Sequence, residues 1–255
     1  MLIDTHTHIY AAAFDEDRDE AIKRAIAAGV LKLVLPAIDS KTTAIMHEVK
    51  RNYPENVFLM MGLHPTHVGL NVEQELAHVK EQLEAHSYVA VGEIGMDLYW
   101  DKTYIEQQKL AFIEQCAWAK ERNLPIVIHV RDSWEELFEI MDKVNDDELR
   151  GVFHCFTGGQ TEAVRALEYG GFLLGIGGVS TYKNGGLDKV IPGVGLENLV
   201  LETDSPYLSP VPCRGKRNES SCVRHVADRV AEILNLTTEE VAQVTTENAV
   251  NLFKI

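Results

Sequence analysis

Residues 89–97 of the chain are VAVGEIGMD. This run is nearly continuous in apolar residues, as is typical of a parallel strand covered on both faces, and Glu93 is a carboxylate inside it. The starts of successive runs of this kind lie 22 to 36 residues apart, which leaves room for a helix and two loops and predicts repeated βα units. The other seven runs are LIDTHTHI at 2–9, VLKLVLPAI at 30–38, VFLMMGLH at 57–64, PIVIHV at 125–130, RGVFHCF at 150–156, FLLGIGG at 172–178 and LVLETD at 199–204.

The segments between these runs indicate helices. Thr237-Thr238-Glu239-Glu240 resembles a capping box and predicts a further short helix near the C-terminus. Eight strands alternating with helices favour an α/β fold, a single (β/α)8 TIM barrel spanning 1–255, over an open doubly wound sheet. Apolar residues recur at helical spacing over 15–28, 72–85, 105–121, 134–144, 161–169 and 221–234, and a short helix is expected at about 186–191.

Composition excludes several classes of protein. The 255 residues carry 24 basic and 39 acidic side chains, a net charge of −15, which argues against a protein that coats DNA by bulk charge. No apolar run approaches the ~20 residues that span a bilayer, and no secretory signal is visible. The four cysteines lack CxxC pairing, as fits a reducing compartment. We expect a cytoplasmic monomer that does not bind membranes.

Imidazoles and carboxylates stand at the carboxyl ends of six predicted strands. In a barrel these ends form the mouth where the active site lies. Both side-chain types bind divalent metals, so the pattern predicts a metal site there. The residues are His6, His8, His64, Glu93, Asp97, His129, His154, Glu202 and Asp204.

The histidines have a second interpretation. His6 and His8 are two residues apart on a predicted strand, so they share a face and can reach one ion, although a single His-x-His also occurs by chance on surfaces. A lone histidine in an apolar run is more often a satisfied core residue. His129 and His154 occupy matching ends of adjacent predicted strands, which favours the ligand interpretation.

The number of ligands predicts two ions. Glu93 and Asp204 lie in runs that indicate burial, where an unpaired charge is very costly and a metal supplies the counter-charge. Four histidines and two carboxylates exceed the needs of one open catalytic site. We therefore expect Glu93 to bridge two ions, with His6, His8 and Asp204 on one side and His129 and His154 on the other.

At these residues the sequence resembles the TatD family of metal-dependent deoxyribonucleases, a branch of the amidohydrolase-like barrels. The resemblance extends over nearly 250 residues, with the motifs in the family's order. They are IDTHTH at 3–8, GLHP at 62–65, VGEIGMD at 91–97, IHVRDS at 128–133, HCFTG at 154–158, LETDSPYL at 201–208, RGKRNE at 214–219 and TTENAVNLF at 245–253. The chain departs from the family at Ser220-Ser221, where a proline is usual.

The resemblance implies a (β/α)8 fold, a dinuclear or trinuclear metal centre and 3′-to-5′ exonuclease hydrolysis of DNA or oligonucleotides. Glu202 and His64 would serve a third ion or the substrate phosphate. One ion would be held by His6, His8, Glu93 and Asp204, and the other by Glu93, His129 and His154.

The predicted mechanism follows from phosphodiester chemistry. We expect that a metal-activated hydroxide would attack phosphorus and displace the 3′ oxygen, and that Asp204, with Glu93 as the second catalytic residue, would orient or deprotonate the water. Magnesium, manganese and zinc all suit imidazole and carboxylate ligands. An amidohydrolase or lactonase acting on a small substrate is the alternative enzyme, and a catalytically idle metal-binding scaffold is the alternative outside enzymes.

Basic and aromatic residues near the predicted mouth suggest substrate contacts. Arg214, Lys216 and Arg217 form its one dense basic cluster, and we expect them to contact phosphate. Arg131 is a second phosphate candidate or a partner of a nearby carboxylate. Tyr99 and Trp100, which follow Asp97, either stack an unpaired base or cover a helix. Cys155, which follows His154, is expected to point away from the ligands.

Overall fold

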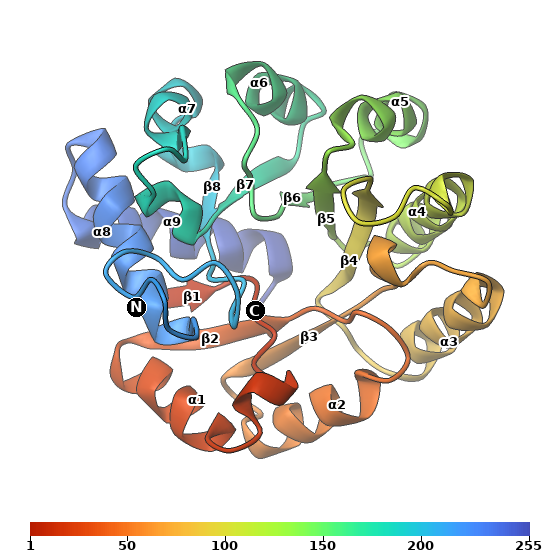
Figure 1. Cartoon of the computed structure of the whole chain (residues 1–255), viewed down its shortest axis with the longest axis horizontal. Coiled ribbons are helices and arrows are strands. Elements are labelled where there is room, and N and C mark those ends of the chain that lie inside the picture. The colour runs from red at the N-terminus through yellow and green to blue at the C-terminus, as the bar shows by residue number, and fades with distance from the viewer.

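The computed structural model describes all 255 residues and contains one sheet of eight parallel strands in chain order. The strands form a central ring that the helices surround (Figure 1). The predicted (β/α)8 TIM barrel is confirmed. The strands are β1 (Leu2–Asp4), β2 (Val30–Leu35), β3 (Val57–Met61), β4 (Ala90–Asp97), β5 (Ile126–Arg131), β6 (Gly151–Phe153), β7 (Phe172–Ile176) and β8 (Leu199–Leu201). The helices are α1 (Arg18–Ala27), α2 (Thr43–Asn52), α3 (Val72–Ala85), α4 (Ile105–Glu121), α5 (Trp134–Val144), α6 (Gln160–Glu168), α7 (Leu187–Val194), α8 (Val223–Leu234) and α9 (Thr238–Phe253).

The seam between β8 and β1 is joined just beyond the two strands. The backbone N–H of Thr5 donates to the carbonyl of Leu201 at 3.0 Å. The buried carboxylate of Asp4 accepts hydrogen bonds from the hydroxyl of Thr203 at 2.6 Å and from its backbone N–H at 2.9 Å. Burial raises the pKa of Asp4 to about 7. Asp4 therefore connects the first and last strands through its side chain.

The C-terminal helix α9 packs against the interior layer of the barrel. Its residues Ala249, Leu252 and Phe253 join one buried residue from each of seven strands in a single apolar cluster. Thr237 caps α9 reciprocally with Glu240, as the sequence predicts. The prediction that this helix is short is wrong, because α9 extends over 16 residues and its buried residues run from Val241 to Phe253. The strand residues of the cluster are Ile3, Val34, Met60, Ala90, Val127, Val152 and Val200.

Several strands end earlier than their apolar runs. β1, β6 and β8 stop at Asp4, Phe153 and Leu201, so the functional residues after them lie on loops. Cys155 and Asp204 have φ values of 45° and 55°, a left-handed conformation that is incompatible with extended strand pairing. None of the helices combines the length and apolarity needed to cross a bilayer.

Candidate metal centre

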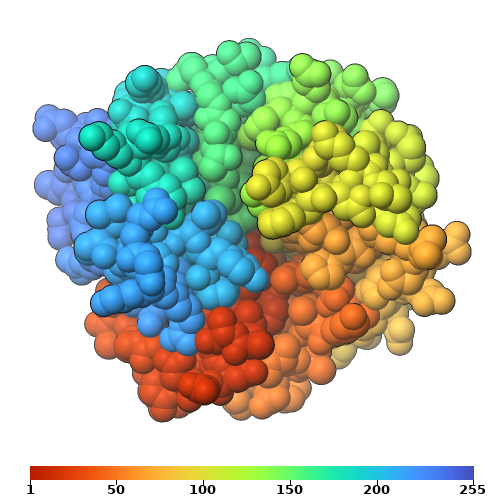
Figure 2. All heavy atoms as spheres, viewed as in Figure 1, coloured from red at the N-terminus to blue at the C-terminus, as the bar shows by residue number.

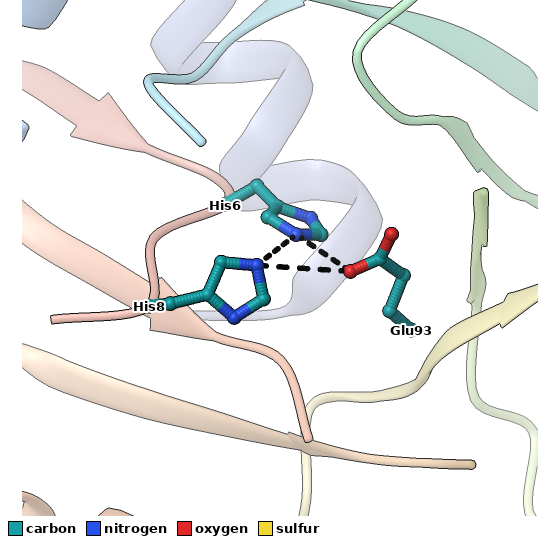
Figure 3. Close-up of side chains that lie close together, drawn as sticks. All are labelled: His6, His8 and Glu93. Carbon is teal, nitrogen blue, oxygen red and sulfur yellow. Dashed lines mark hydrogen bonds and ion pairs between the residues drawn. The ribbon is translucent and has the colours of Figure 1, made fainter. Parts of the chain in front are cut away.

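One group of ligand atoms surrounds the Oε2 oxygen of Glu93. The Nε2 atom of His6 lies 3.1 Å from this oxygen and 3.3 Å from the Nε2 atom of His8 (Figure 3). The Oδ1 atom of Asp204 lies 3.4 Å from the Nε2 atom of His8. The four residues come from the loops after β1 and β8 and from the middle of β4, so closing the barrel brings them together.

A second group surrounds the other oxygen of Glu93. Its Oε1 atom lies 2.8 Å from Nδ1 of His129, 3.1 Å from Nε2 of His64 and 3.4 Å from Nε2 of His154. Glu93 thus presents one oxygen to each group, in the position expected of a bridging carboxylate. His64, which the resemblance associates with a third ion or the phosphate, lies nearer to this oxygen than His154 does.

Tyr10, which the sequence analysis did not single out, orients His8. The Tyr10 hydroxyl lies 2.8 Å from Nδ1 of His8 and donates to the carbonyl of Pro36 at 2.7 Å. Because the single hydroxyl proton is given to a carbonyl, Nδ1 of His8 must be the donor to Tyr10. In the neutral ring, the lone pair of Nε2 of His8 therefore faces Glu93 and Asp204, as a metal ligand requires.

Asp97 holds His129 in the same way. Its Oδ2 atom lies 2.8 Å from Nε2 of His129, on the opposite side of the ring from Glu93. The sequence places Asp97 among the strand-end residues of the predicted metal site but does not assign it to an ion or to a partner. The available signal was its position four residues after Glu93 on one strand, which puts both side chains on the same face.

Glu202 lies behind His154. Its Oε1 atom is 3.0 Å from Nδ1 of His154 and accepts the backbone N–H of Cys155. A Cβ atom at Gly175 would collide with the Oε2 atom of Glu202, so only glycine leaves room for this carboxylate. The prediction that Cys155 points away is wrong: its sulfur and ligand atoms of His154 and Asp204 lie within 4.8 Å of one another. Strand alternation does not apply to Cys155, because β6 ends at Phe153.

The chemistry of this cluster fits divalent cations. Its carboxylates form ion pairs only with histidines, and no lysine or arginine neutralises them. The buried Nδ1 atom of His6 and the buried Oε2 atom of Glu202 have no hydrogen-bond partner. Buried charges and polar atoms without partners are costly, and a cation can satisfy lone pairs that no side chain does. Glu93, His6, His8 and Glu202 are almost fully buried.

Proton affinities differ across the cluster. Burial would raise the pKa of Glu93, but His64, His154 and His6 together hold it well below its ordinary value. Burial lowers the pKa of His64 to about 4. Burial would also lower the pKa of His154, but Glu202 and Glu93 raise it to about 10. A cation would therefore compete with a proton more strongly at His154 than at His64.

The basic residues predicted to contact phosphate have different surroundings. Arg217 forms a two-point ion pair with Asp17, with N–O distances of 2.7 and 2.8 Å, and donates to the carbonyl of Ala13. Arg214 and Lys216 are exposed and have no carboxylate partner, and the Arg214 guanidinium lies 4.1 Å from the ring centre of Tyr182. All three residues belong to the loop after β8.

The whole chain is similar to known proteins. The family model described as TatD related DNase matches residues 3–254. The metal-dependent hydrolase YabD of Bacillus subtilis is 41% identical over 100% of both chains. The 3′-5′ ssDNA/RNA exonuclease TatD of Erwinia tasmaniensis is 30% identical over 100% of both chains. The crystal structure of YjjV, a TatD homologue from Escherichia coli K12, has a TM-score of 0.93 at 30% identity and covers 100% of this chain and 98% of that one. The chain therefore belongs to the TatD-related DNase family and is a metal-dependent hydrolase.

Proposed function

We propose that the protein is a 3′-to-5′ exonuclease that hydrolyses phosphodiester bonds of single-stranded DNA with two divalent ions. The position of Glu93 carries the proposal, because its two oxygens face separate groups of imidazoles. A carboxylate shared in this way can bridge two ions about 3.5–4 Å apart, the arrangement used in many nucleases. The name of the Erwinia relative, an ssDNA/RNA exonuclease, supports this choice of substrate.

The ligands divide between the two oxygens of Glu93. Glu202 lies close enough to orient His154, and His64 lies close enough to complete the second site. Alternatively, the two residues would serve a third ion. Magnesium, manganese and zinc each accept such ligands. One ion would be bound by His6, His8, Glu93 and Asp204, and the other by Glu93, His129 and His154.

When bound, the ions would lower the pKa of a water molecule and neutralise the charge that develops on the phosphate. Asp204 is the general base in this proposal, because its side chain is 15% exposed whereas that of Glu93 is 2% exposed. Its carboxylate can therefore reach a water at the open side of the cluster and accept its proton. Arg214 and Lys216 have free positive charges with which to hold the anionic strand.

An exonuclease assay tests the proposal. Single-stranded DNA labelled at its 5′ end should shorten stepwise with manganese or magnesium, and EDTA should stop the reaction. Asp204→Asn should reduce the rate by about 100-fold or more, since removing a positioned proton acceptor typically loses 10²–10⁴-fold. Hydrolysis of a lactone or an amide by wild-type protein that leaves the DNA intact would instead identify the small-substrate enzyme and overturn the proposal.

A further inference from the structure

Two exposed aromatic rings stand on the loop between β4 and α4. Tyr99 is 52% and Trp100 is 69% exposed, and their ring centres are 5.0 Å apart at an interplanar angle of 88°. The yellow segment that contains this loop protrudes beside the central depression of the face shown in Figure 2. Rings that only covered a helix end would be largely buried, so this exposure argues against a purely packing role.

The two rings are attached to the metal-binding cluster through one carboxylate. The Oδ1 atom of Asp97 accepts the backbone N–H groups of Tyr99 and Trp100 at 3.0 and 3.2 Å. Its Oδ2 atom lies 2.8 Å from Nε2 of His129. The backbone of the loop is thus held at a defined position relative to His129, although its side chains extend into solvent.

The guanidinium of Arg131, which has no carboxylate partner, lies beside the two aromatic rings. Arg131, the last residue of β5, places its guanidinium carbon 3.7 Å from the ring centre of Tyr99 and 5.3 Å from that of Trp100. Arg131 forms no ion pair or side-chain hydrogen bond, in a chain whose net charge is −15. Stacking leaves its N–H groups free to meet an anion.

A cavity of about 220 Å³ adjoins Trp100 on the side of the turn Pro65–His67 (η2). Trp100, Tyr104 and Val68 contribute ring and apolar surface to its lining, and Asp97 lies at its wall. The cavity therefore offers a planar, partly apolar group a place next to an exposed indole and close to the metal-binding cluster.

We propose that Tyr99, Trp100 and Arg131 form a stacking site for an unpaired base of the DNA strand whose phosphate reaches the metal centre. This inference rests on the proposed function. Every nucleobase has a π-face, so aromatic rings hold single strands without reading their sequence, and arginine adds cation–π attraction and a phosphate contact. A duplex keeps its bases stacked and paired, so the site selects single-stranded ends.

Tryptophan fluorescence measures binding without relying on turnover. Trp118 is buried and Trp134 is half-buried, so Trp100 is the exposed reporter. With magnesium present, a phosphorothioate oligothymidylate that resists hydrolysis should quench the fluorescence of the full-length protein. An abasic strand with the same number of phosphates should quench it much less. Equal quenching by the two strands would mean that only phosphates are bound and would overturn the stacking site.

Substitutions separate stacking from hydrolysis. The quantity to measure is the ratio of kcat/KM for oligothymidylate to kcat/KM for bis(p-nitrophenyl) phosphate. Trp100→Ala should lower this ratio by roughly ten-fold, through a higher KM for the oligonucleotide, as the loss of one stacked base typically does. Trp100→Phe should recover most of the ratio. Arg165→Ala is the matched control for Arg131→Ala, because Arg165 stacks on Phe138 at 4.4 Å on the surface of α6 and should not change the ratio.

The outcomes distinguish the two proposals. Wild-type protein that hydrolyses neither substrate overturns the proposed exonuclease. If wild-type protein and Trp100→Ala hydrolyse both substrates with the same ratio of kcat/KM values, the stacking site is overturned and the proposed exonuclease is not. A ratio that falls for Trp100→Ala and Arg131→Ala but not for Arg165→Ala supports it.

Discussion

The carboxylate of Asp97 lies 2.8 Å from Nε2 of His129, while Nδ1 of the same ring lies 2.8 Å from Glu93. The other oxygen of Asp97 is engaged by two backbone N–H groups. An ionised carboxylate only accepts hydrogen bonds, so Asp97 keeps a proton on Nε2 and leaves the lone pair of Nδ1 for a cation beside Glu93.

Replacing Asp97 by asparagine should reverse this tautomer. The asparagine carbonyl remains with the loop N–H groups, so its NH2 group faces Nε2 of His129 and moves the ring proton to Nδ1, which then cannot ligate. We expect Asp97→Asn to lower manganese affinity by about 10- to 100-fold, the usual effect of removing a partner behind a ligand. Calorimetric titration measures the affinity. Asp101→Asn, which changes an exposed acid on the same loop, is the control, and equal affinities in the two variants would contradict the prediction.

Replacing Glu93 by glutamine should remove the bridge between the two groups of imidazoles. An amide keeps one ligating oxygen, and its NH2 group repels a cation, so we expect about one bound ion fewer per chain and a fall in DNA hydrolysis of more than about 100-fold. Elemental analysis of dialysed protein and an exonuclease assay check this. Glu75→Gln is the matched control, because Glu75 is also a buried carboxylate but accepts hydrogen bonds from Ser40, outside the site. A Glu93→Gln protein that retains two ions would refute the bridging role.

The sequence predicted best those features that depend on strand periodicity. Glu93 and His129 lie on strands, so their position at the mouth follows from the barrel itself, and the structure brings them within 2.8 Å of each other. The grouping of His6, His8 and Asp204 was also predicted, but on the assumption that all three lie on strands. These three residues lie beyond the strand ends, and the loops, not strand alternation, direct their side chains.

Features that depend on loop paths could not be predicted. Nothing local indicates that Tyr10 turns back to His8, or that Arg217 meets Asp17, 200 residues earlier in the chain. Asp4 shows the same difficulty, because its carboxylate accepts a hydrogen bond from Thr203, 199 residues later in the chain, across the barrel seam.

Salt dependence should distinguish the basic residues of the loop after β8. Arg214 and Lys216 have no carboxylate partner, whereas the guanidinium of Arg217 is paired with Asp17. If the first two neutralise phosphates, Arg214→Ala and Lys216→Ala should each reduce the slope of log affinity for single-stranded DNA against log salt by about 0.7. Arg217→Ala should leave the slope unchanged. Fluorescence anisotropy at several salt concentrations measures it, and a reduced slope in Arg217→Ala alone would reverse the assignment.

Metal binding to the cluster should stabilise the fold, and the stabilisation should grow as the metal concentration rises above its Kd. A ligand that binds only the folded state contributes about 2.7 kcal/mol at 100 times its Kd, and in a chain of this size that raises Tm by about 5 °C or more. Manganese should therefore raise the Tm of wild-type protein, EDTA should reverse the shift, and Glu93→Gln should lose most of it. Thr237→Ala is the control, because loss of the α9 cap should lower stability by about 1 kcal/mol without touching the cluster. That variant should begin from a lower Tm and still gain the full manganese shift. A shift that survives in Glu93→Gln would mean that manganese stabilises the protein from somewhere other than the Glu93 cluster.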